Sequence, residues 1–424
     1  MTLQDFRTAM MRCIRCSMCK FIPWEQVKSQ RFSGVCPSIA RYNFHAYSGG
    51  GKLIMAAALL CGRIEYTDKL LDIIYHCQMC GGCDVSCKYS RDFEVLEPLY
   101  QFRKKLIENS QIYLTHIPVI RGLKKEDNMM QRLKAERGKW AEGLDVKDIT
   151  KEKAEVYYHA GCLSCFDEEL WPDTRAAVKL LKKAGVDVSV AGKEETCCGG
   201  RAYEMGYEGE LIKYAEHNVE MLRTAGAKTV VTSCSDCYYA FKVLYDKIGK
   251  KSNLEVLHIT EYLDRLIKEA NLKLTKKIPM VVTYHDPCHL GRMGEPYVHW
   301  QGVEKKVRGQ VIMHDPPKEL RRGTHGVYKP PRDILKSIPG LRLIEMERIR
   351  EYAWCCGAGG GVSDTDRDFA IWTALERIEE AKATGAEAIV TACPWCKRNF
   401  KDAIRESGDR LEIYDIVELL EQAV

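Results

Sequence analysis

Cysteine is the residue type that points most directly to chemistry in this chain. There are 20 cysteines among 424 residues, and 18 of them fall into short, repeated spacings. A disulfide framework would scatter them more evenly, whereas tight groups in a chain without a secretory signal are typical of metal ligation. The sequence therefore predicts metal centres held by thiolates.

The first two cysteine groups lie within the first 90 residues. One reads Cys-x2-Cys-x2-Cys with a later Cys-Pro, and the other reads Cys-x2-Cys-x2-Cys-x3-Cys. Three thiolates at such spacing wrap one face of a [4Fe-4S] cubane, and a fourth from the other group closes it. Two zinc sites are the alternative, but zinc usually takes separated Cys-x2-Cys pairs. The predicted ligand sets are Cys13, Cys16, Cys19 and Cys87 for one cluster, and Cys36, Cys77, Cys80 and Cys83 for the other.

The other ten clustered cysteines form two copies of one pattern. Each copy has a cysteine after a short β-rich run, an adjacent pair followed by glycine, and a Cys-x2-Cys. Five cysteines are one more than a cubane or a tetrahedral zinc ion uses, so a cluster of extended shape suits them better. These candidate ligands and catalytic residues are Cys162, Cys197, Cys198, Cys234 and Cys237 in the first copy, and Cys288, Cys355, Cys356, Cys393 and Cys396 in the second.

A few neighbouring residues have two interpretations. Cys61 and Cys165 fall outside both patterns, and packing is the common role of such a cysteine, although Cys165 could reach the metal of its copy. His159, His285 and His289 flank the first cysteine of each copy. They are candidates for proton delivery to a reduced sulfur or, alternatively, structural groups at strand ends.

The surrounding pattern predicts the elements that position these cysteines. In each copy, helical segments alternate with short Val/Ile strands, which indicates parallel sheets and a Rossmann-like α/β unit. Cysteines at strand carboxyl ends would then converge in one crevice. The region before the copies predicts a mostly helical domain, in which residues 39–60 are helical and Gly49 to Gly51 form a break.

The predicted boundaries follow from these patterns. A helical ferredoxin-like domain with two clusters covers residues 1–136, a charged linker covers 137–154, and the two copies cover 155–272 and 273–424. The second copy carries an insertion at about residues 293–323, rich in Lys, Arg, Pro and aromatic residues. We interpret it as a docking arm or surface loop, because loops absorb insertions at little cost.

Composition excludes several classes of function. The net charge of +5 is too small for a nucleic-acid surface. The longest apolar run, residues 53–61, is about half of a membrane-spanning helix, and the first 12 residues lack the features of a secretory signal. We therefore expect a cytoplasmic protein without a membrane span of its own. No nucleotide or flavin fingerprint is present, so electrons must come from or go to another subunit.

With these motifs in place, the chain resembles a known family. The two cysteine patterns are complete copies of the CCG domain. With the ferredoxin-like domain in front, the whole chain is similar to the D subunit of heterodisulfide reductase, in which the C and B subunits are fused. The resemblance implies a noncubane [4Fe-4S] cluster in each CCG domain, the two facing one another across a disulfide substrate. Zinc in one of the two domains is the alternative. The implied partner is a flavin-containing protein similar to the A subunit of heterodisulfide reductase, or another redox subunit.

The family is wide, and two hypotheses follow. In one, the chain is an electron-transfer subunit of a larger anaerobic complex. Its insertion resembles that of a component of the class II benzoyl-CoA reductase complex, which would imply low-potential electrons supplied by electron bifurcation. In the other, it is a disulfide or heterodisulfide reductase. Similar proteins also serve quinone-linked oxidation of 2-hydroxyacids and glycerol-3-phosphate.

Overall fold

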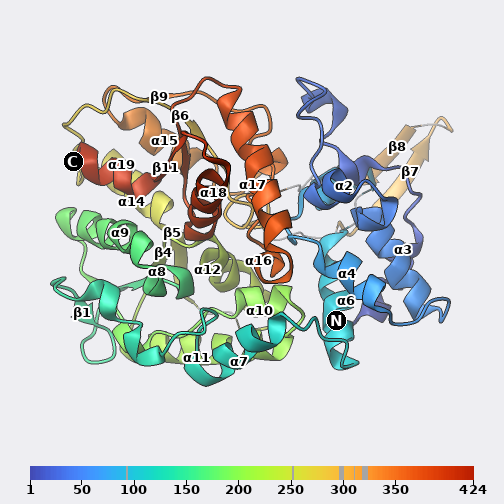
Figure 1. Cartoon of the computed structure of the whole chain (residues 1–424), viewed down its shortest axis with the longest axis horizontal. Helices are drawn as coiled ribbons and strands as arrows, with labels where there is room; N and C mark the ends of the chain where they lie inside the picture. The colour runs from blue at the N-terminus through green and yellow to red at the C-terminus, as the bar shows by residue number, and fades with distance from the viewer. Residues whose placement is uncertain (92–93, 251–252, 296–299, 310, 318–322) are drawn as a thin grey trace.

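Three units make up the chain (Figure 1). The computed structural model covers residues 1–424, and the structure describes all of them except residues 92–93, 251–252, 296–299, 310 and 318–322. A helical N-terminal unit lies beside two α/β units, here named the first repeat (residues 155–272) and the second repeat (residues 273–424). One hydrophobic core takes buried side chains from all three units, so they pack as one body.

The N-terminal unit is built from short helices and 3-10 turns. The sequence predicts that Gly49 to Gly51 break a helix, but in the structure these glycines begin one. The Ser48 hydroxyl caps that helix by accepting a hydrogen bond from the Gly51 amide, at 3.1 Å. The helices are α1 (Arg7–Met11), α2 (Pro37–Tyr42), α3 (Gly49–Leu60), α4 (Asp68–Tyr75), α5 (Gly82–Arg91), α6 (Leu96–Glu108) and α7 (His116–Glu126), with 3-10 turns at Leu3–Phe6, Met18–Lys20, Trp24–Gln26, His45–Tyr47, Lys134–Glu136 and Lys139–Ala141.

The first repeat holds a five-stranded sheet in the order β1-β3-β2-β4-β5, with every pair parallel. The strands are β1 (Lys147–Asp148), β2 (Val156–His159), β3 (Val188–Val190), β4 (Thr229–Thr232) and β5 (Glu255–His258). Helices connect them: α8 (Cys162–Phe166), α9 (Trp171–Lys183), α10 (Gly200–Glu204), α11 (Glu208–Ala225), α12 (Ser235–Tyr239), α13 (Tyr245–Lys247) and α14 (Ile259–Lys268), with a π-helical turn at Ala240–Leu244.

The segment predicted as a linker takes part in this sheet. It supplies the edge strand β1, and it also buries Arg137 and Trp140. The short 3-10 turns before β1 bring both side chains against the first repeat. The predicted boundaries themselves remain a prediction.

The second repeat holds a four-stranded parallel sheet in the order β11-β10-β6-β9. Read from β9, this is the order of the first sheet without β1, which is what an internal duplication predicts. Its strands are β6 (Val281–Tyr284), β9 (Arg342–Leu343), β10 (Ala388–Thr391) and β11 (Glu412–Asp415), and its helices are α15 (Lys329–Ser337), α16 (Val362–Thr365), α17 (Arg367–Lys382), α18 (Pro394–Ser407) and α19 (Ile416–Ala423), with a 3-10 turn at Arg350–Tyr352.

The two repeats pack against each other through helices. From the first repeat, α9 contacts α19 and α14 contacts α15, as Figure 1 shows at the left of the molecule. The mixed α/β class with parallel sheets is therefore confirmed. The first cysteine and the Cys-x2-Cys of each repeat follow the carboxyl ends of central strands, namely β2 and β4 in the first repeat and β6 and β10 in the second.

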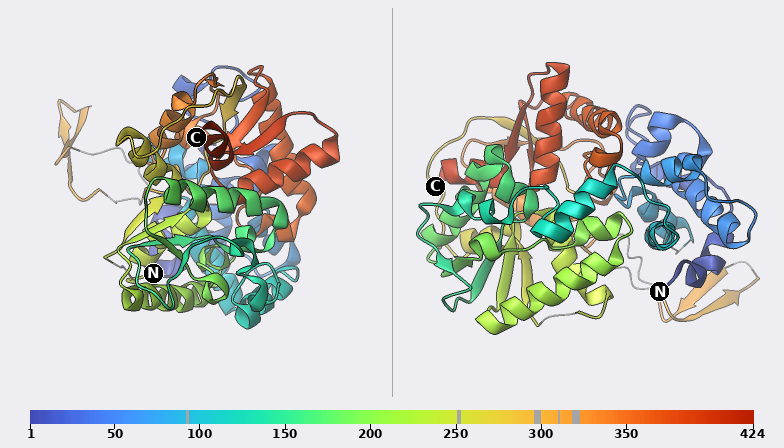
Figure 2. Two further views of the ribbon diagram at one scale, coloured as in Figure 1. Left: turned by 90° about the vertical axis from the view of Figure 1, so that its left-hand side faces the viewer. Right: turned by 60° about the horizontal axis from the view of Figure 1, so that its bottom comes forward.

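The insertion contains a two-stranded antiparallel hairpin, β7 (Val303–Val307) and β8 (Val311–Asp315), separate from both sheets. Figure 2 shows it standing away from the body of the molecule. Val303, Val307, Val311 and Met313 share one face of the hairpin and are exposed. Its predicted docking role stays a prediction.

Among the described residues, no helix combines the length and the apolar character that crossing a membrane requires.

Candidate metal centres

The first cysteine group of the N-terminal unit surrounds a hollow beside the start of α3. Cys13, Cys16, Cys19 and Cys87 all line it. The Gly50 amide donates a hydrogen bond to the Cys19 sulfur at 3.4 Å. A Cβ atom at position 50 would lie 3.4 Å from the Cys13 sulfur, whereas one at position 51 would lie 2.1 Å from the His45 carbonyl oxygen, so glycine is required at position 51. Four thiols and an amide aimed at a sulfur fit a [4Fe-4S] cluster.

The second group gathers on the other side of the same helix end. Cys36 interacts electrostatically with Cys77 and Cys80, and Cys83 interacts with Cys36 and Cys77. A Cβ atom at Gly49 would lie 3.2 Å from the Cys83 sulfur. The amino end of α3, with its partial positive charge, therefore adjoins both groups and would favour anionic clusters at both.

The structure thus brings together the two sets of four cysteines that the spacing predicts. Cys83 also interacts electrostatically with Cys19, so the two groups are neighbours. Ligation of a cluster by these thiols remains a prediction.

The five cysteines of the first repeat form one continuous group. Cys162 contacts Cys197, which contacts Cys198; Cys198 contacts Cys237, and Cys237 contacts Cys234. All five are buried. Hydrogen bonds from Cys197 and Cys237 lower the pKa of the Cys198 thiol to about 5. A thiolate at this position is what a metal ligand requires.

Glycines allow the backbone to approach these sulfurs. The Gly199 amide donates to the Cys197 sulfur at 3.3 Å. Gly161 has a positive φ of 84°, and a Cβ atom there would lie 2.9 Å from the Cys237 sulfur. A side chain at position 161 would therefore displace the thiol, so the turn after β2 requires glycine.

The second repeat repeats this arrangement. Cys288 contacts Cys355, which contacts Cys356; Cys356 contacts Cys396, and Cys396 contacts Cys393. The Gly357 amide donates to the Cys355 sulfur at 3.3 Å, as Gly199 does in the first repeat. The two glycine-cysteine turns are therefore equivalent in chemistry as well as in sequence.

Two contacts link the cysteine groups of different units. The thiol of Cys80 in the N-terminal unit interacts with that of Cys355, and the thiol of Cys234 interacts with that of Cys393. The thiols therefore form an unbroken series that runs from the N-terminal unit through the second repeat to the first. No spacing in the sequence indicates this order, because both links join residues more than 150 positions apart.

A buried arginine spans the first of these links. The Arg292 Nε group donates to the Cys80 carbonyl at 2.5 Å, and its Nη1 group donates to the Ala353 carbonyl at 2.7 Å. Its other terminal nitrogen has no hydrogen-bond partner among the described residues. The guanidinium thus places a positive charge that interacts with Cys80, Cys288 and Cys355, and sequence reasoning gave no signal for it.

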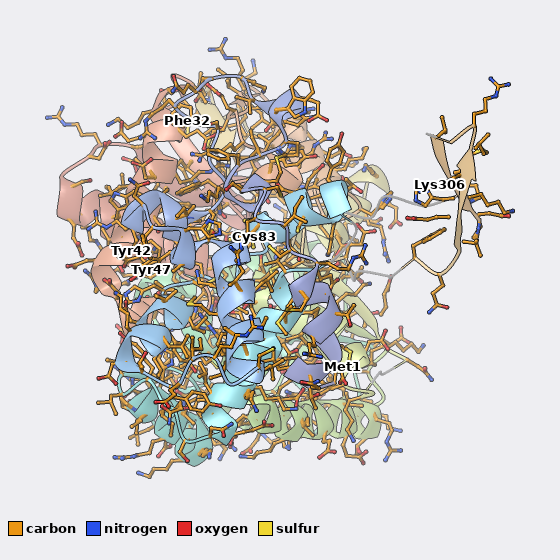
Figure 3. All side chains as sticks on the ribbon, turned by 90° about the vertical axis from the view of Figure 1, so that its right-hand side faces the viewer. Met1, Phe32, Tyr42, Tyr47, Cys83 and Lys306 are labelled. Atoms are coloured by element: carbon orange, nitrogen blue, oxygen red, sulfur yellow. The ribbon has the colours of Figure 1, made fainter. Side chains whose placement is uncertain are left out.

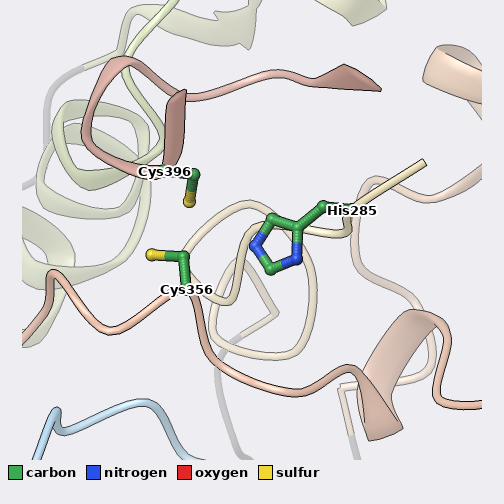
Figure 4. A group of neighbouring side chains, drawn as sticks. All are labelled: His285, Cys356 and Cys396. Atoms are coloured by element: carbon green, nitrogen blue, oxygen red, sulfur yellow. The ribbon is translucent and has the colours of Figure 1, made fainter. Parts of the chain in front are cut away.

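His285 faces the thiols of the second repeat (Figure 4). Ligand atoms of His285, Cys356 and Cys396 all lie within 4.8 Å of one another. The Arg377 Nε group donates to His285 Nδ1 at 3.2 Å, so the neutral ring carries its proton on Nε2. Burial lowers the pKa of His285. The neutral ring in this tautomer can donate that proton toward sulfur, whereas metal ligation through Nε2 would require the proton to move to Nδ1.

His289 bridges the two repeats. Its Nε2 atom lies 2.6 Å from Glu204, and its Nδ1 atom lies 2.8 Å from Asp236. Burial lowers the pKa of this histidine, but the two carboxylates and Cys288 outweigh burial and raise it well above the ordinary value. His289 is therefore a buried cation beside Cys288, at the junction where both cysteine groups meet.

The other flagged residues lie apart from the thiol series or at its edge. His159 is buried 3.9 Å from Glu195 and packs on Phe241. Cys165 donates to Glu195 at 3.4 Å. Cys61 ends α3 and is close to Arg7. His159, Cys165 and Cys61 therefore make packing and hydrogen-bond contacts with neighbouring side chains. A role of Cys165 as a metal ligand stays a prediction.

An unexpected ion pair supports the first repeat. Arg137 and Glu195 are both buried and 3.1 Å apart, and Arg137 also lies 3.5 Å from the Cys162 sulfur. Glu195 accepts amide hydrogen bonds from Ala160 and Gly161 at 3.0 Å each. The pair fixes the turn before Cys162. The only available signal was the position of Glu195 two residues before the cysteine pair.

A cavity of about 710 Å³ opens where the three units meet. Gly81 and Arg292 line it on the side of Cys80, and Tyr239 lines it on the side of the repeats. The Tyr239 ring packs against His289 with centroids 5.1 Å apart. The cavity has the size of a small-molecule site, and the wall of the cavity lies next to both Cys80 and His289.

Known domain families match all three units. A 4Fe-4S dicluster domain matches residues 9–90, and the cysteine-rich CCG domain matches residues 156–242 and 311–401. The second CCG match begins within the insertion and so leaves out Cys288. The structure nevertheless brings Cys288 into contact with Cys355, as the duplication predicts.

Curated relatives resemble the chain over most of its length. It is 30% identical to the D subunit of the dihydromethanophenazine:CoB–CoM heterodisulfide reductase of Methanosarcina acetivorans, over 97% of this chain and 93% of that protein. It is also 30% identical to the EtfAB:quinone oxidoreductase of Syntrophomonas wolfei, over 68% of this chain and 38% of that protein. Both relatives are named as oxidoreductases.

A solved structure shares the fold. A hypothetical protein from Helicobacter pylori matches with a TM-score of 0.54 and 11% identity, over 89% of this chain and 67% of that chain. At this identity the match supports the architecture alone.

Proposed function

Because the chain belongs to the family of heterodisulfide reductase D subunits and is an iron–sulfur oxidoreductase subunit, we propose that it carries single electrons between two cubane and two noncubane [4Fe-4S] clusters within a larger redox complex. The observation that carries the proposal is the unbroken series of thiols through Cys80–Cys355 and Cys234–Cys393. An electron path requires its carriers to be neighbours, and these contacts make them so.

The proposed ligands fall into four sets. When bound, the clusters supply one-electron carriers whose potentials depend on hydrogen bonds, charge and burial. The cubane sets are Cys13, Cys16, Cys19 and Cys87, and Cys36, Cys77, Cys80 and Cys83; the noncubane sets are Cys162, Cys197, Cys198, Cys234 and Cys237, and Cys288, Cys355, Cys356, Cys393 and Cys396.

The surrounding residues orient these thiols and exclude water from them. Amides of Gly50, Gly199 and Gly357 donate to sulfur, and such hydrogen bonds stabilise negative charge there. The repeats bury all of their cysteines except Cys288, which is half-buried. We also propose that each repeat is Rossmann-like. In its parallel sheet, the first strand of the repeat lies between the second and the third strands, as in the order β3-β2-β4-β5 of the first repeat.

Disulfide reduction is the second candidate function, and His289 favours it. Reduction of a disulfide to two thiols takes up two electrons and two protons. His289 holds a proton beside Cys288 and packs on Tyr239 in the wall of the 710 Å³ cavity. A disulfide in that cavity would lie close to this proton source.

The partner in this proposal is a flavin-containing protein similar to the A subunit of heterodisulfide reductase, or another redox component of the complex. Relatives named as a heterodisulfide reductase component and as a quinone oxidoreductase support such an assembly. The supply of low-potential electrons to benzoyl-CoA reduction by bifurcation, and a place in quinone-linked oxidation, remain predictions about this chain.

The test is the metal content of the anaerobically purified protein. Four [4Fe-4S] clusters require about 16 iron atoms and as many sulfides per chain. About 12 iron atoms with one zinc would overturn the arrangement and assign one repeat a structural metal. Turnover then separates the two functions, because a protein that reduces no small disulfide with reduced viologen, yet passes electrons to a partner, is a carrier only.

A further inference from the structure

We propose that the surface around Cys16 is the docking site for an acidic electron-transfer protein that carries its redox cofactor close to its own surface. We name this region the Cys16 surface and define it by its exposed members: Met11, Arg12, Ile14, Arg15, Cys16, Phe21, Trp24, Glu25, Gln26, Val27 and Lys28. The inference rests on the proposed function, because it requires a cluster bound by Cys13, Cys16, Cys19 and Cys87.

Exposure singles out this end of the thiol series. Of the 18 clustered cysteines, all of which the structure describes, Cys16 is the one that is exposed. The opposite end of the series, at Cys162, is buried. An electron crosses between proteins most readily where a carrier lies near the surface, so exchange is expected at Cys16.

Large apolar side chains surround the exposed thiol. Ile14 is 58% exposed and lines the same hollow as Cys16, and Met11 is 59% exposed at the end of α1. Trp24, eight residues after Cys16, is 76% exposed. The segment that carries Phe21 and Trp24 lies along α5, because the Ser86 hydroxyl donates to the Phe21 carbonyl at 2.9 Å. Ser86 precedes Cys87, so this apolar edge adjoins the fourth ligand.

Such a patch is characteristic of a protein interface. Soluble proteins rarely expose several large apolar side chains around one point, and exposed tryptophan is common among the residues that contribute most to binding. The face of the N-terminal unit is seen in Figure 3, with the hairpin that carries Lys306 standing to one side.

Charge specifies the partner. Residues 1–36 contain six basic residues and two acidic ones. Arg12, Arg15 and Lys28 are exposed, and none of them makes an ion pair with any residue that the structure describes. Unpaired cations around an apolar centre attract an acidic surface and accelerate its association by about 10- to 1,000-fold at low salt. A cationic partner, or a second copy approaching through the same surface, would be repelled.

The redox step is a simple exchange. One electron leaves the reduced cofactor of the partner and enters the cluster held by the four thiols, and no bond or proton changes place. The charge of the acidic partner therefore affects the rate at which the two proteins associate, and the electron transfer itself is unchanged.

Stopped-flow reduction of the holoprotein by a reduced acidic [2Fe-2S] ferredoxin tests the proposal. The test variant combines Arg12→Glu, Arg15→Glu and Lys28→Glu. The matched control combines Lys273→Glu, Lys276→Glu and Lys277→Glu, which change charge equally near the C-terminus. We expect the test variant to lose at least tenfold in the second-order rate constant, and the control to lose less than twofold. Trp24→Ser should lose a few-fold at any salt concentration.

Calorimetry of the oxidised ferredoxin with each oxidised protein gives a readout independent of turnover. We expect salt-sensitive binding to wild type and control, and loss of binding in the test variant. Equal losses in both triple variants, or a wild-type rate that ignores ionic strength, would overturn the proposal. A wild-type dimer that the test variant dissociates would assign the surface to a second copy instead.

Reduced methyl viologen separates this proposal from the function it rests on. It is small and cationic, so it needs no docking surface. If it reduces all clusters of every variant while ferredoxin rates ignore the substitutions, the docking surface is wrong and the electron-carrier function stands. If iron is deficient or viologen reduces no cluster in wild type, the proposed function itself has failed.

Discussion

The two repeats hold the same cysteines in the same strand order but surround them with different charges. In the first repeat, Arg137 pairs with Glu195 beside Cys162. In the second repeat, His285 faces Cys356 and is held by Arg377. Cys162 of the first repeat therefore has an ion pair as neighbour, whereas Cys356 of the second repeat has a neutral imidazole.

This difference separates what fixes the ligands from what tunes them. Strand ends and the turns at Gly199 and Gly357 place the cysteines, and the duplication preserved those features, although Pro287 stands where the first repeat has Gly161. The charged groups differ between the repeats, since Arg137 precedes the first repeat and Arg377 of α17 stands where α11 of the first repeat has Asn218. Hydrogen bonds and charges around the sulfurs set reduction potentials, so we expect the two sites to differ in potential.

Removal of one cysteine from each repeat is the strongest test of this comparison. Cys355→Ser should cost about four iron atoms per chain and also block electron flow to the first repeat, because Cys355 contacts Cys80. Cys198→Ser should cost a similar amount of iron while the second repeat is still reduced. Metal analysis and EPR under viologen reduction distinguish the two. Cys61→Ser is the control, and a loss of iron there would contradict the ligand assignment.

Loss of the buried arginines should destabilise the repeats unequally. Arg137→Met leaves Glu195 buried without its ion-pair partner, and the expected loss is about 3–5 kcal/mol in free energy of unfolding. Arg377→Met should cost less, because Arg348 still pairs with Glu380 at 2.9 Å. Anaerobic urea denaturation of both holoproteins measures the difference. Equal losses would show that the two ion-pair networks are equivalent after all.

Arg292 provides a test at the boundary between units. Arg292→Gln removes a positive charge near Cys80 and Cys355, which disfavours the more negative reduced state. We expect the potentials of the two adjacent clusters to fall by about 1–2 kcal/mol, or about 40–90 mV for one electron. EPR-monitored redox titration reads each cluster separately. In Arg292→Lys, the reduction potentials of the two adjacent clusters should stay close to those of wild type. The reduction potential of the cluster in the first repeat should not change in either variant.

The sequence predicted the features that depend on local spacing. Cysteine triplets, the paired cysteines followed by glycine and the repeated Val/Ile strands all act within a few residues, so the two N-terminal groups, the five-cysteine groups and the parallel α/β class could be read directly. The membership of each group in space agrees with the prediction for the N-terminal unit, while ligation is untested.

Features that depend on distant contacts could not be read in this way. The Cys80–Cys355 and Cys234–Cys393 links, and the positions of Arg137 and Arg292, arise from packing between units. The glycines at 49–51 show the opposite failure. Local propensity predicts a break, but the Ser48 cap and the close approach of Gly49 to Cys83 and of Gly51 to the His45 carbonyl place those glycines at the start of a helix.

The smallest expected effect concerns the last helix of each repeat. His258 and Asp415 occupy equivalent positions, at the end of the outer strand, and each caps the following helix in a capping box with a glutamate. Burial lowers the pKa of His258 to about 4 and raises the pKa of Asp415 well above its ordinary value. The same cap therefore titrates in opposite directions in the two repeats.

The sign of each effect follows from proton binding. The folded state binds His258's proton less well than the unfolded state does, so its contribution is present above pH 6.5 and is lost as the pH falls toward 4. Asp415 contributes below its ordinary pKa and loses that contribution as the pH rises. Between pH 7 and pH 5.5, the free energy of unfolding of His258→Asn should therefore fall by about 1 kcal/mol less than that of wild type. Anaerobic urea denaturation at the two pH values measures this difference. Asp415→Asn should not reduce the free energy of unfolding that is lost between pH 7 and pH 5.5. If it reduces that loss as much as His258→Asn does, the two caps do not titrate in opposite directions.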